Sequence, residues 1–157
     1  MLVRPAIATD LDTIATLLTE SWSSTTVIAH GTSYDASQLP ALLAERDGRP
    51  VGLLTYTLGS DSLEIVTLDA SEQHIGIGTA LFSAAVECAR EAGARRVWLV
   101  TTNDNLDALR FYQRRGMRIS AVTPGAVDSA RTRKSSIPDI GNYGIEIHDE
   151  LILEMMI

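Results

Sequence analysis

The segment from residue 71 to residue 81 has the residue types and spacing with the clearest chemical meaning. It contains Gly76 and Gly78, and it follows an apolar stretch at 63–68 that predicts a β-strand. Glycine lets the backbone come close to a ligand, and the first amides of a helix point outward at the positive end of its dipole. A strand, a glycine turn and a helix in this order therefore form a site suited to an anion such as phosphate.

Three phosphate-binding patterns can be compared with this turn. A nucleotide-binding loop of the Walker type ends in Gly-Lys-Ser/Thr, and Gly78-Thr79-Ala80 does not match it. The dinucleotide fingerprint needs a third glycine where Leu81 stands, and it usually begins on an early strand. The third pattern, Gln/Arg-x-x-Gly-x-Gly/Ala, is matched from Gln73 to Gly78. A plain glycine turn that binds nothing stays open as the alternative.

A second motif follows the first after one predicted helix and one predicted strand. It has Asn105 with an alanine three residues later, the aromatic pair Phe111-Tyr112, and Gly116 followed by a hydrophobic residue. The two motifs, in this order, resemble the two signatures of the GNAT superfamily of N-acetyltransferases. The resemblance covers about residues 40–157 well, and the amino-terminal helix only by its type.

This resemblance implies a GNAT-like acyl-CoA N-acyltransferase fold in a single domain over residues 1–157. The fold class is α/β with a mixed sheet, in which an antiparallel meander precedes a β-α-β-α-β half with one right-handed crossover. Periodicity and turn residues predict strands at 2–4, 39–46, 51–58, 63–68, 97–100, 117–122 and 145–156, and helices at 11–22, 76–93 and 105–115. Residues 23–38 are expected to be a loop or mobile lid, and 128–138 is polar and basic.

Acetyl-CoA is the co-substrate that the resemblance implies, with no metal. Backbone groups of Val66, Thr67 and Leu68 would hold its pantetheine arm and polarise the thioester carbonyl. The turn would hold the pyrophosphate through Gln73, His74, Ile75, Gly76, Ile77, Gly78 and Thr79. Asn105 would hydrogen-bond the cofactor, and Tyr112 would lie near its sulfur. Many relatives carry arginine where Gln73 stands, so one phosphate-binding charge is missing here, and Arg110, Arg114 and Arg115 are other sources of positive charge.

Tyr112 is the candidate general acid. Forming an amide from a thioester requires an amine without its extra proton, a stabilised oxyanion and a proton for the leaving thiol. A phenol with an ordinary pKa of about 10 keeps its proton at neutral pH and can donate it. The alternative is that Tyr112 is a core aromatic on the same helix face as Leu109. The resemblance implies direct attack in a ternary complex, and no acyl-enzyme nucleophile is evident in the sequence.

Glu64 is the candidate general base. It lies at the start of the strand that leads into the glycine turn, and period-two alternation would place Glu64, Val66 and Leu68 on one face. The alternatives are a solvated charge or a carboxylate that fixes the fold by hydrogen bonds. His30, Tyr34 and Asp35 lie in the expected loop, a segment in which members of the resembled family often bind acceptors. A histidine that titrates near neutrality could also serve as the base, and each of the three has the alternative of being a plain loop residue.

Composition limits the classes of partner. Lysine and arginine total 13 and aspartate and glutamate total 20, so the net charge is −7. Such a chain is a poor general binder of nucleic acid or of an anionic membrane, and it is compatible with a small-molecule or peptidyl amine. The lone Cys88 excludes an internal disulfide and is expected to pack in the core rather than act as a nucleophile. His30, His74 and His148 are too scattered for a metal site.

The start of the sequence lacks a signal peptide's pattern and no run is long enough to span a membrane, so the expected location is cytoplasmic. Many members of the resembled family are dimers, which makes a homodimer one expectation. Two functions remain as alternatives to N-acetyl transfer. One is a non-catalytic acyl-CoA-binding sensor, and the other is a dinucleotide-dependent oxidoreductase, which the missing third glycine disfavours.

Overall fold

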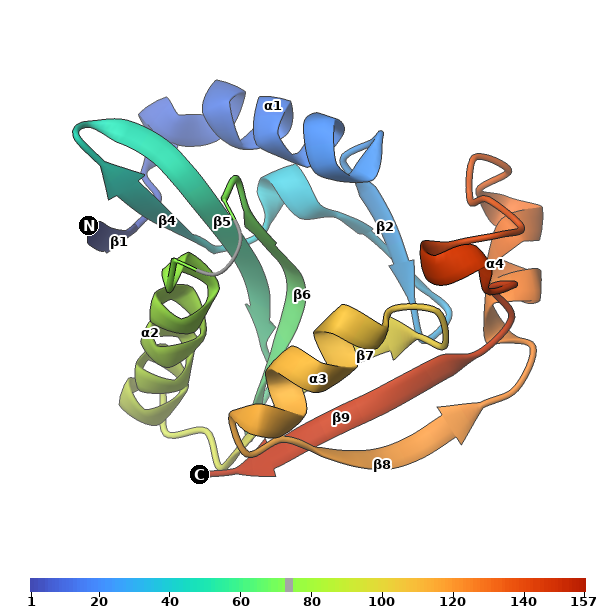
Figure 1. Ribbon diagram of the computed structural model, residues 1–157. Helices are drawn as coiled ribbons and strands as arrows, with labels where there is room; N and C mark the ends of the chain where they lie inside the picture. The colour runs from blue at the N-terminus through green and yellow to red at the C-terminus, as the bar shows by residue number, and fades with distance from the viewer. Residues whose placement is uncertain (73–74) are drawn as a thin grey trace. The chain divides into compact units, whose positions relative to one another are not determined.

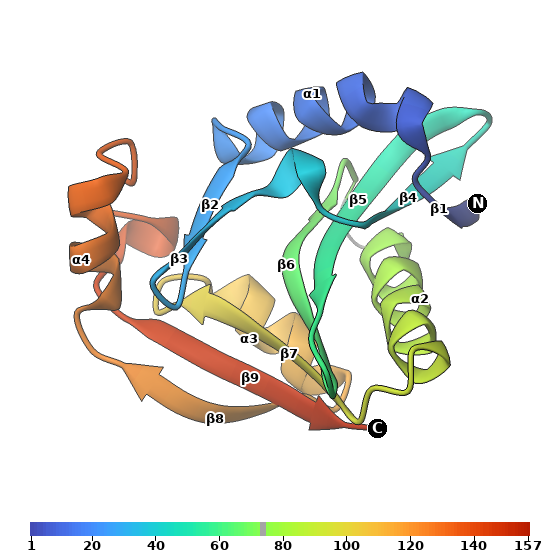
Figure 2. The ribbon, with the colours of Figure 1, turned by 180° about the vertical axis from the view of Figure 1, so that it is seen from behind.

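The computed structural model describes residues 1–72 and 75–157, which group into two compact units. The amino-terminal unit comprises Met1–Val27, Tyr34–Val97 and Ile157. The carboxy-terminal unit comprises Ile28–Ser33 and Trp98–Met156. Figure 1 and Figure 2 show the elements of the two units from opposite sides.

The amino-terminal unit is built on a sheet whose neighbouring strands run antiparallel. Their order is β1 (Leu2–Pro5), β4 (Ala41–Arg46), β5 (Arg49–Leu58) and β6 (Ser62–Ala70). Asp47 and Gly48, with φ of +52° and +73°, form the tight turn between β4 and β5, as an Asp-Gly pair predicts. The meander expected from the sequence is therefore confirmed.

Two helices pack on this sheet. Helix α1 (Leu11–Trp22) buries Ile14 and Leu18 in a cluster with Leu43 and Leu53 of the strands. Helix α2 (Ile77–Glu91) packs against β4, β5 and β6. Since side chains alternate between the faces of a strand, the residues next to Leu53 point away from α1 and toward α2. The two helices thus cover opposite faces (Figure 1).

Gly52 lets α2 lie close to β5. A β-carbon at this position would lie 2.5 Å from Cγ2 of Ile77 and 2.9 Å from Cδ1 of Leu81, both in the first two turns of α2. It would also lie 3.1 Å from the backbone oxygen of Asp69 on β6. The missing side chain at Gly52 therefore sets how closely the start of α2 approaches the sheet.

The loop or lid expected at 23–38 is wrong, because this segment forms a hairpin. It consists of β2 (Thr26–Ala29) and β3 (Thr32–Asp35), followed by a 3-10 turn at Ala36–Gln38. His30 and Gly31 have φ of +42° and +76°, the two positive values that a primed hairpin turn needs. The β-branched residues at 25–28 were the strand signal, and the serine-rich composition around them obscured it.

The carboxy-terminal unit contains the rest of the regular structure. Its elements are β7 (Arg96–Thr102, which begins in the amino-terminal unit), α3 (Leu106–Arg114), β8 (Arg118–Thr123), α4 (Ala126–Arg133) and β9 (Glu150–Met156). The strand order is β7-β9-β8, with β8 antiparallel to β9. Helix α4 was not predicted, because its polar sequence has little helical periodicity. Among the described residues, no helix is long and apolar enough to cross a membrane.

The last strand begins later than its predicted start at residue 145. The backbone amides of His148 and Asp149 both donate to the side-chain oxygen of Asn103, at 2.9 and 3.0 Å. The amide of Ile147 donates to the backbone oxygen of Asp139 at 2.9 Å. These donors are therefore not available to a strand ladder, and β9 starts at Glu150.

Replacing Gly52 by alanine is expected to lower the free energy of unfolding by about 1–3 kcal/mol, because the added methyl group overpacks the contact with α2. The measurement is urea unfolding. Gly59→Ala is the matched control, since a β-carbon there meets only the flexible Ser62 hydroxyl at 3.3 Å and the Ser62 backbone oxygen at 3.7 Å. Equal midpoints for the two variants would contradict the close packing of α2 on β5.

Candidate functional site

Strand β6 has a β-bulge at Val66. Ile65 is paired with Tyr56 and Thr67 with Thr55, so two successive residues of β5 face three of β6 and Val66 is the extra one. A bulge leaves one residue out of the ladder and re-aims the backbone next to it. The segment for which the sequence predicts a pantetheine-binding backbone, 66–68, is therefore the segment in which the regular ladder is interrupted.

The bulge also changes which side chains share a face. Glu64 pairs with Thr57 and Leu68 pairs with Leu54, and these partners are three residues apart on β5. Paired residues point to the same side of a sheet, so Glu64 and Leu68 point to opposite sides. The predicted common face of Glu64, Val66 and Leu68 is wrong, because strict period-two alternation does not continue through a bulge. Glu64 and Asp69 share the face that carries α1.

Glu64 is a buried carboxylate with a phenol donor. Its exposed fraction is 4%, and its Oε2 accepts a hydrogen bond of 2.8 Å from the Tyr34 hydroxyl on β3. Burial, and then the hydrogen bond to Glu64 and its negative charge, raise the pKa of Tyr34 above its ordinary value. The solvated-charge alternative for Glu64 is therefore wrong, and the Tyr34 hydroxyl acts as a hydrogen-bond donor to it.

Asp35 and His30, the two other candidates from this segment, both have structural contacts. Asp35 accepts from the backbone amide and hydroxyl of Ser37, at 3.1 and 2.6 Å, and so caps the 3-10 turn that follows it. The ring of His30 lies 5.1 Å from the indole of Trp98, centroid to centroid, within the carboxy-terminal unit. His30, at the turn of the hairpin, thus belongs to the carboxy-terminal unit, whereas Tyr34 and Asp35, on β3, belong to the amino-terminal unit.

Helix α2 begins at the glycine turn, as predicted. Its N-cap residue is Gly76, whose φ of +86° favours glycine, and a β-carbon there would meet nothing within 4 Å. Within the described residues, no side chain caps this helix start, and its first intrahelical bond runs from the amide of Ala80 to Gly76. Amides from Ile77 to Thr79 therefore lie at the positive end of the helix dipole. The predicted site residues Gln73 and His74 lie outside the described residues.

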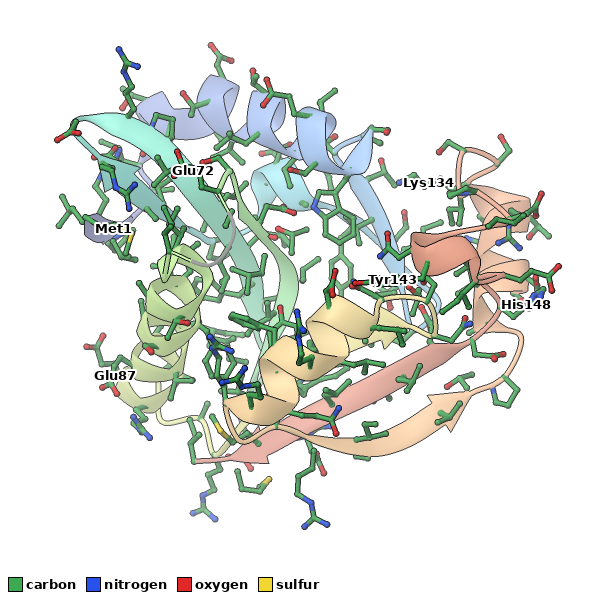
Figure 3. All side chains as sticks on the ribbon, viewed as in Figure 1. Met1, Glu72, Glu87, Lys134, Tyr143 and His148 are labelled. Carbon is green, nitrogen blue, oxygen red and sulfur yellow. The ribbon has the colours of Figure 1, made fainter. Side chains whose placement is uncertain are left out.

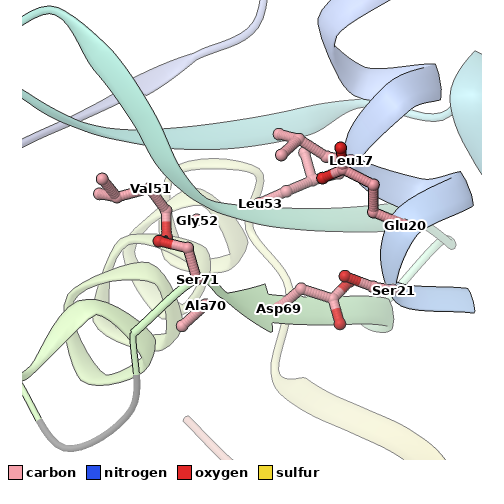
Figure 4. Close-up of a pocket in the computed structure, with 9 residues that line it drawn as sticks. All are labelled: Leu17, Glu20, Ser21, Val51, Gly52, Leu53, Asp69, Ala70 and Ser71. Carbon is pink, nitrogen blue, oxygen red and sulfur yellow. The ribbon is translucent and has the colours of Figure 1, made fainter.

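A small pocket of about 80 Å³ opens beside this turn, within the amino-terminal unit (Figure 4). Its lining comes from the end of α1, the start of β5 and the end of β6: Leu17, Glu20, Ser21, Val51, Gly52, Leu53, Asp69, Ala70 and Ser71. Glu72, which Figure 3 labels, forms an exposed ion pair of 3.6 Å with Arg46.

Asp69 is a residue that the sequence analysis did not single out. Its Oδ2 accepts a hydrogen bond of 2.6 Å from the indole N–H of Trp22 at the end of α1. Burial raises the pKa of Asp69 to about 6, although the Trp22 bond acts in the opposite direction. No sequence motif marks it, since the burial comes from α1, which precedes it by about fifty residues in the chain.

The second motif lies in the carboxy-terminal unit, where both of its key residues have structural contacts. Asn105 caps α3, since its side-chain oxygen accepts from the amide of Ala108 at 3.2 Å. This bond gives a local reason for asparagine at the start of α3, whereas the donor is a backbone amide and does not require alanine three residues later. Tyr112 is 7% exposed and its ring meets that of Phe111 edge to face, with centroids 5.1 Å apart. Arg115 lies over the Phe111 ring and donates to its backbone oxygen at 2.8 Å.

Glu150 is a second buried carboxylate that the sequence analysis missed. It is 6% exposed at the start of β9, and both of its oxygens accept from the backbone amide of His30, at 3.2 and 3.3 Å. Burial raises its pKa. The polar stretch before β9 hid this position, since one glutamate in an acidic segment carries no distinguishing pattern.

Neither Cys88 nor a cluster of metal-ligating side chains offers an alternative chemistry among the described residues. Burial raises the pKa of the Cys88 thiol, which also interacts with Tyr56 of β5, so the thiol stays protonated and is a poor nucleophile. In the part of the chain that the structure describes, histidine, cysteine, aspartate and glutamate form no group of three or more suited to a metal ion.

The chain is similar in sequence and in fold to acetyltransferases. The Acetyltransferase (GNAT) family model matches residues 9–117. The uncharacterised protein YxbD of Bacillus subtilis (strain 168) is 36% identical over 154 residues, which are 98% of this chain and 97% of that protein. An IAA acetyltransferase from Bacillus cereus ATCC 14579 has a TM-score of 0.73 at 21% identity and 99% coverage of both chains. A GNAT family acetyltransferase from Elizabethkingia anophelis, solved with acetyl-CoA bound, has a TM-score of 0.70 at 20% identity, covering 99% of this chain and 97% of that one. These likenesses confirm the predicted fold class.

The fluorescence of Trp22 is expected to titrate with a midpoint near pH 6, because the Asp69 carboxyl that its indole N–H contacts has a pKa of about 6. This carboxyl holds its proton more tightly in the folded chain than at its ordinary pKa of 3.8. Its contribution to the free energy of unfolding is therefore complete below about pH 4 and is lost as the pH rises through 6.

The measurement is emission against pH in a Trp98→Phe background, which leaves Trp22 as the only tryptophan. Asp69→Asn is the control and should abolish the transition. A transition that persists in Asp69→Asn would show that another group causes it.

Proposed function

The chain belongs to the GNAT family of acetyltransferases, and from this premise we propose that it transfers the acetyl group of acetyl-CoA to a primary amine of a small molecule or peptide. The observation that carries the proposal is the combination, within one unit, of a bulged strand and a helix that starts at a glycine turn. The bulge takes Val66 out of the ladder between β5 and β6, and the glycine turn leaves the first backbone amides of α2 at the positive end of the helix dipole. A solved neighbour of the same fold has acetyl-CoA bound, which supports this choice of co-substrate.

The residues present fit such a co-substrate. The start of α2 has no side-chain cap among the described residues and has open space at Gly76, as a pyrophosphate group requires. Ile75, Gly76, Ile77, Gly78 and Thr79 would hold that group, together with Gln73 and His74. Backbone groups of Val66, Thr67 and Leu68 at the bulge would hold the pantetheine arm, and Asn105 is proposed to hydrogen-bond the cofactor. Acetyl-CoA itself supplies a thioester-activated acetyl group.

Glu64 is proposed as the general base. A carboxylate that is 4% exposed and held by a phenol is costly to bury, and such groups are found where a protein uses their charge. Glu64 would take the proton of the amine nitrogen as that nitrogen attacks, directly or through one water molecule. Val66 and its neighbours would donate backbone hydrogen bonds to the oxygen on which charge develops.

Tyr112 is proposed as the general acid. Its ring is packed edge to face against Phe111, so the hydroxyl is carried by a side chain with a fixed position. The phenol proton would pass to the sulfur of the leaving group, while the amine proton passes to Glu64. The transfer then proceeds by direct attack, with both substrates bound together.

Gly78→Glu is expected to abolish binding of acetyl-CoA, because a carboxylate in the first turn of α2 repels a pyrophosphate group. The fold should persist, since an acidic side chain at a helix start is favourable. The measurement is the thermal shift with acetyl-CoA, CoA and NADPH. Ligand at 100 times the dissociation constant stabilises the wild type by about 2.7 kcal/mol, or several degrees in the melting midpoint.

The matched control is Gly59→Glu, which adds the same charge at an exposed turn and should keep the full shift. Equal affinity for acetyl-CoA in Gly78→Glu would refute the pyrophosphate assignment. A shift with NADPH alone would replace the acetyltransferase proposal by a dinucleotide enzyme.

Tyr112→Phe is expected to lower kcat by about a hundredfold, the usual contribution of a proton donor, with the acetyl-CoA thermal shift unchanged. Turnover is measured as thiol release with an amine identified from a panel. Tyr143→Phe is the control, because the Tyr143 hydroxyl donates to the exposed Asp107, at 2.6 Å. Unchanged kcat in Tyr112→Phe would exclude the general-acid role.

A further inference from the structure

The hairpin at 26–35 delivers one side chain to the candidate base. Tyr34 lies on β3, 30 residues before Glu64 in the chain, and its hydroxyl donates to Oε2 of Glu64 at 2.8 Å. Tyr34 is partly buried, and Glu64 on β6 is almost completely so. The contact therefore joins a connecting hairpin to the strand that carries the bulge.

A buried carboxylate needs such a donor. Removing a charged group from water is unfavourable unless hydrogen bonds replace the lost hydration. A hydrogen bond from a neutral donor to a carboxylate is short and stronger than one between neutral groups. The Tyr34 bond thus replaces part of the hydration that the Glu64 carboxylate loses on burial, and it fixes the direction of the carboxylate plane at one oxygen.

We propose that Tyr34 is a positioning residue for acetyl transfer, which holds the Glu64 carboxylate oriented to receive the proton of the acceptor amine. This inference rests on the proposed function, since it assumes that Glu64 is the general base. It assigns to the hairpin a role in catalysis rather than only in covering the sheet.

The chemistry of Tyr34 agrees with a donor that does not itself react. Burial and the neighbouring carboxylate raise the pKa of its phenol above the ordinary value, so the hydroxyl keeps its proton at every pH at which the enzyme would work. In the transfer step the amine N–H bond breaks and the proton forms a bond to a Glu64 oxygen. The Tyr34 O–H bond stays intact throughout.

The contact itself can be tested without turnover. Incorporating 3-fluorotyrosine at position 34 places a ¹⁹F nucleus beside the hydroxyl, so its chemical shift reports the hydrogen bond that this hydroxyl donates. The Glu64→Gln substitution should move that signal, because it replaces a charged acceptor by a neutral one. An unchanged ¹⁹F chemical shift would mean that the two side chains do not interact in solution, and the proposal would fail.

The role in catalysis is tested by a double-mutant cycle with Tyr34→Phe, Glu64→Gln and both together. Tyr34→Phe is expected to reduce kcat about tenfold and to leave the KM for acetyl-CoA unchanged, since loss of a hydrogen bond to a charged group has an effect of this size. In the Glu64→Gln background the same substitution should have no further effect. Tyr56→Phe is the matched control, because its hydroxyl interacts with Cys88 in the same unit.

The outcomes separate the two proposals. Wild-type turnover in Glu64→Gln would remove the base assignment and the Tyr34 role with it. Low turnover in Glu64→Gln combined with wild-type kcat in Tyr34→Phe would overturn the Tyr34 role and leave the base in place. Equal losses for Tyr34→Phe in both backgrounds would mean that the tyrosine acts on the fold alone. No acetyl-CoA thermal shift in the wild type would refute the proposed function itself.

Discussion

The pairing of β5 with β6, and the bulge that interrupts it at Val66, is the constraint on which the amino-terminal unit depends. The bulge shifts the ladder by one residue, so Glu64 and Asp69, five residues apart, point to the same face. In an unbroken strand an odd spacing would place them on opposite faces. Gly52, on β5, then allows α2 to start close to the same strand pair. The pairing of β5 with β6 thus sets the direction of both carboxylates, the interruption of the backbone ladder at Val66 and the place where α2 begins.

Both carboxylates on that face depend on donors from the first part of the chain. Tyr34 of the hairpin donates to Glu64, and Trp22 of α1 donates to Asp69. Burying a carboxylate near apolar groups is unfavourable without such donors, and the raised pKa of Asp69 is the residual cost. The segments before the meander are therefore part of the site's electrostatics, although the recognisable motifs come after it.

The two motifs combine structural and functional requirements. Gly76 must adopt a positive φ to start α2, and Asn105 must accept a backbone amide to start α3. These needs account for glycine and asparagine at those positions without any ligand. The start of α2 favours a cofactor role, because the glycine turn leaves backbone amides there rather than bulky side chains. Family membership and local physics are thus compatible at both helix starts.

The sequence by itself determined the local features: the Asp47-Gly48 turn, the helix that begins at Gly76, the amphipathic helix before Gly116 and the fold class that two ordered motifs imply. Each depends on neighbouring residues, whose periodicity and turn chemistry can be read directly. Only the tertiary structure decided the Tyr34–Glu64 contact, the pKa of Asp69 and the broken alternation at Val66. These arise from pairing and burial between segments distant in the chain, which leave no local pattern.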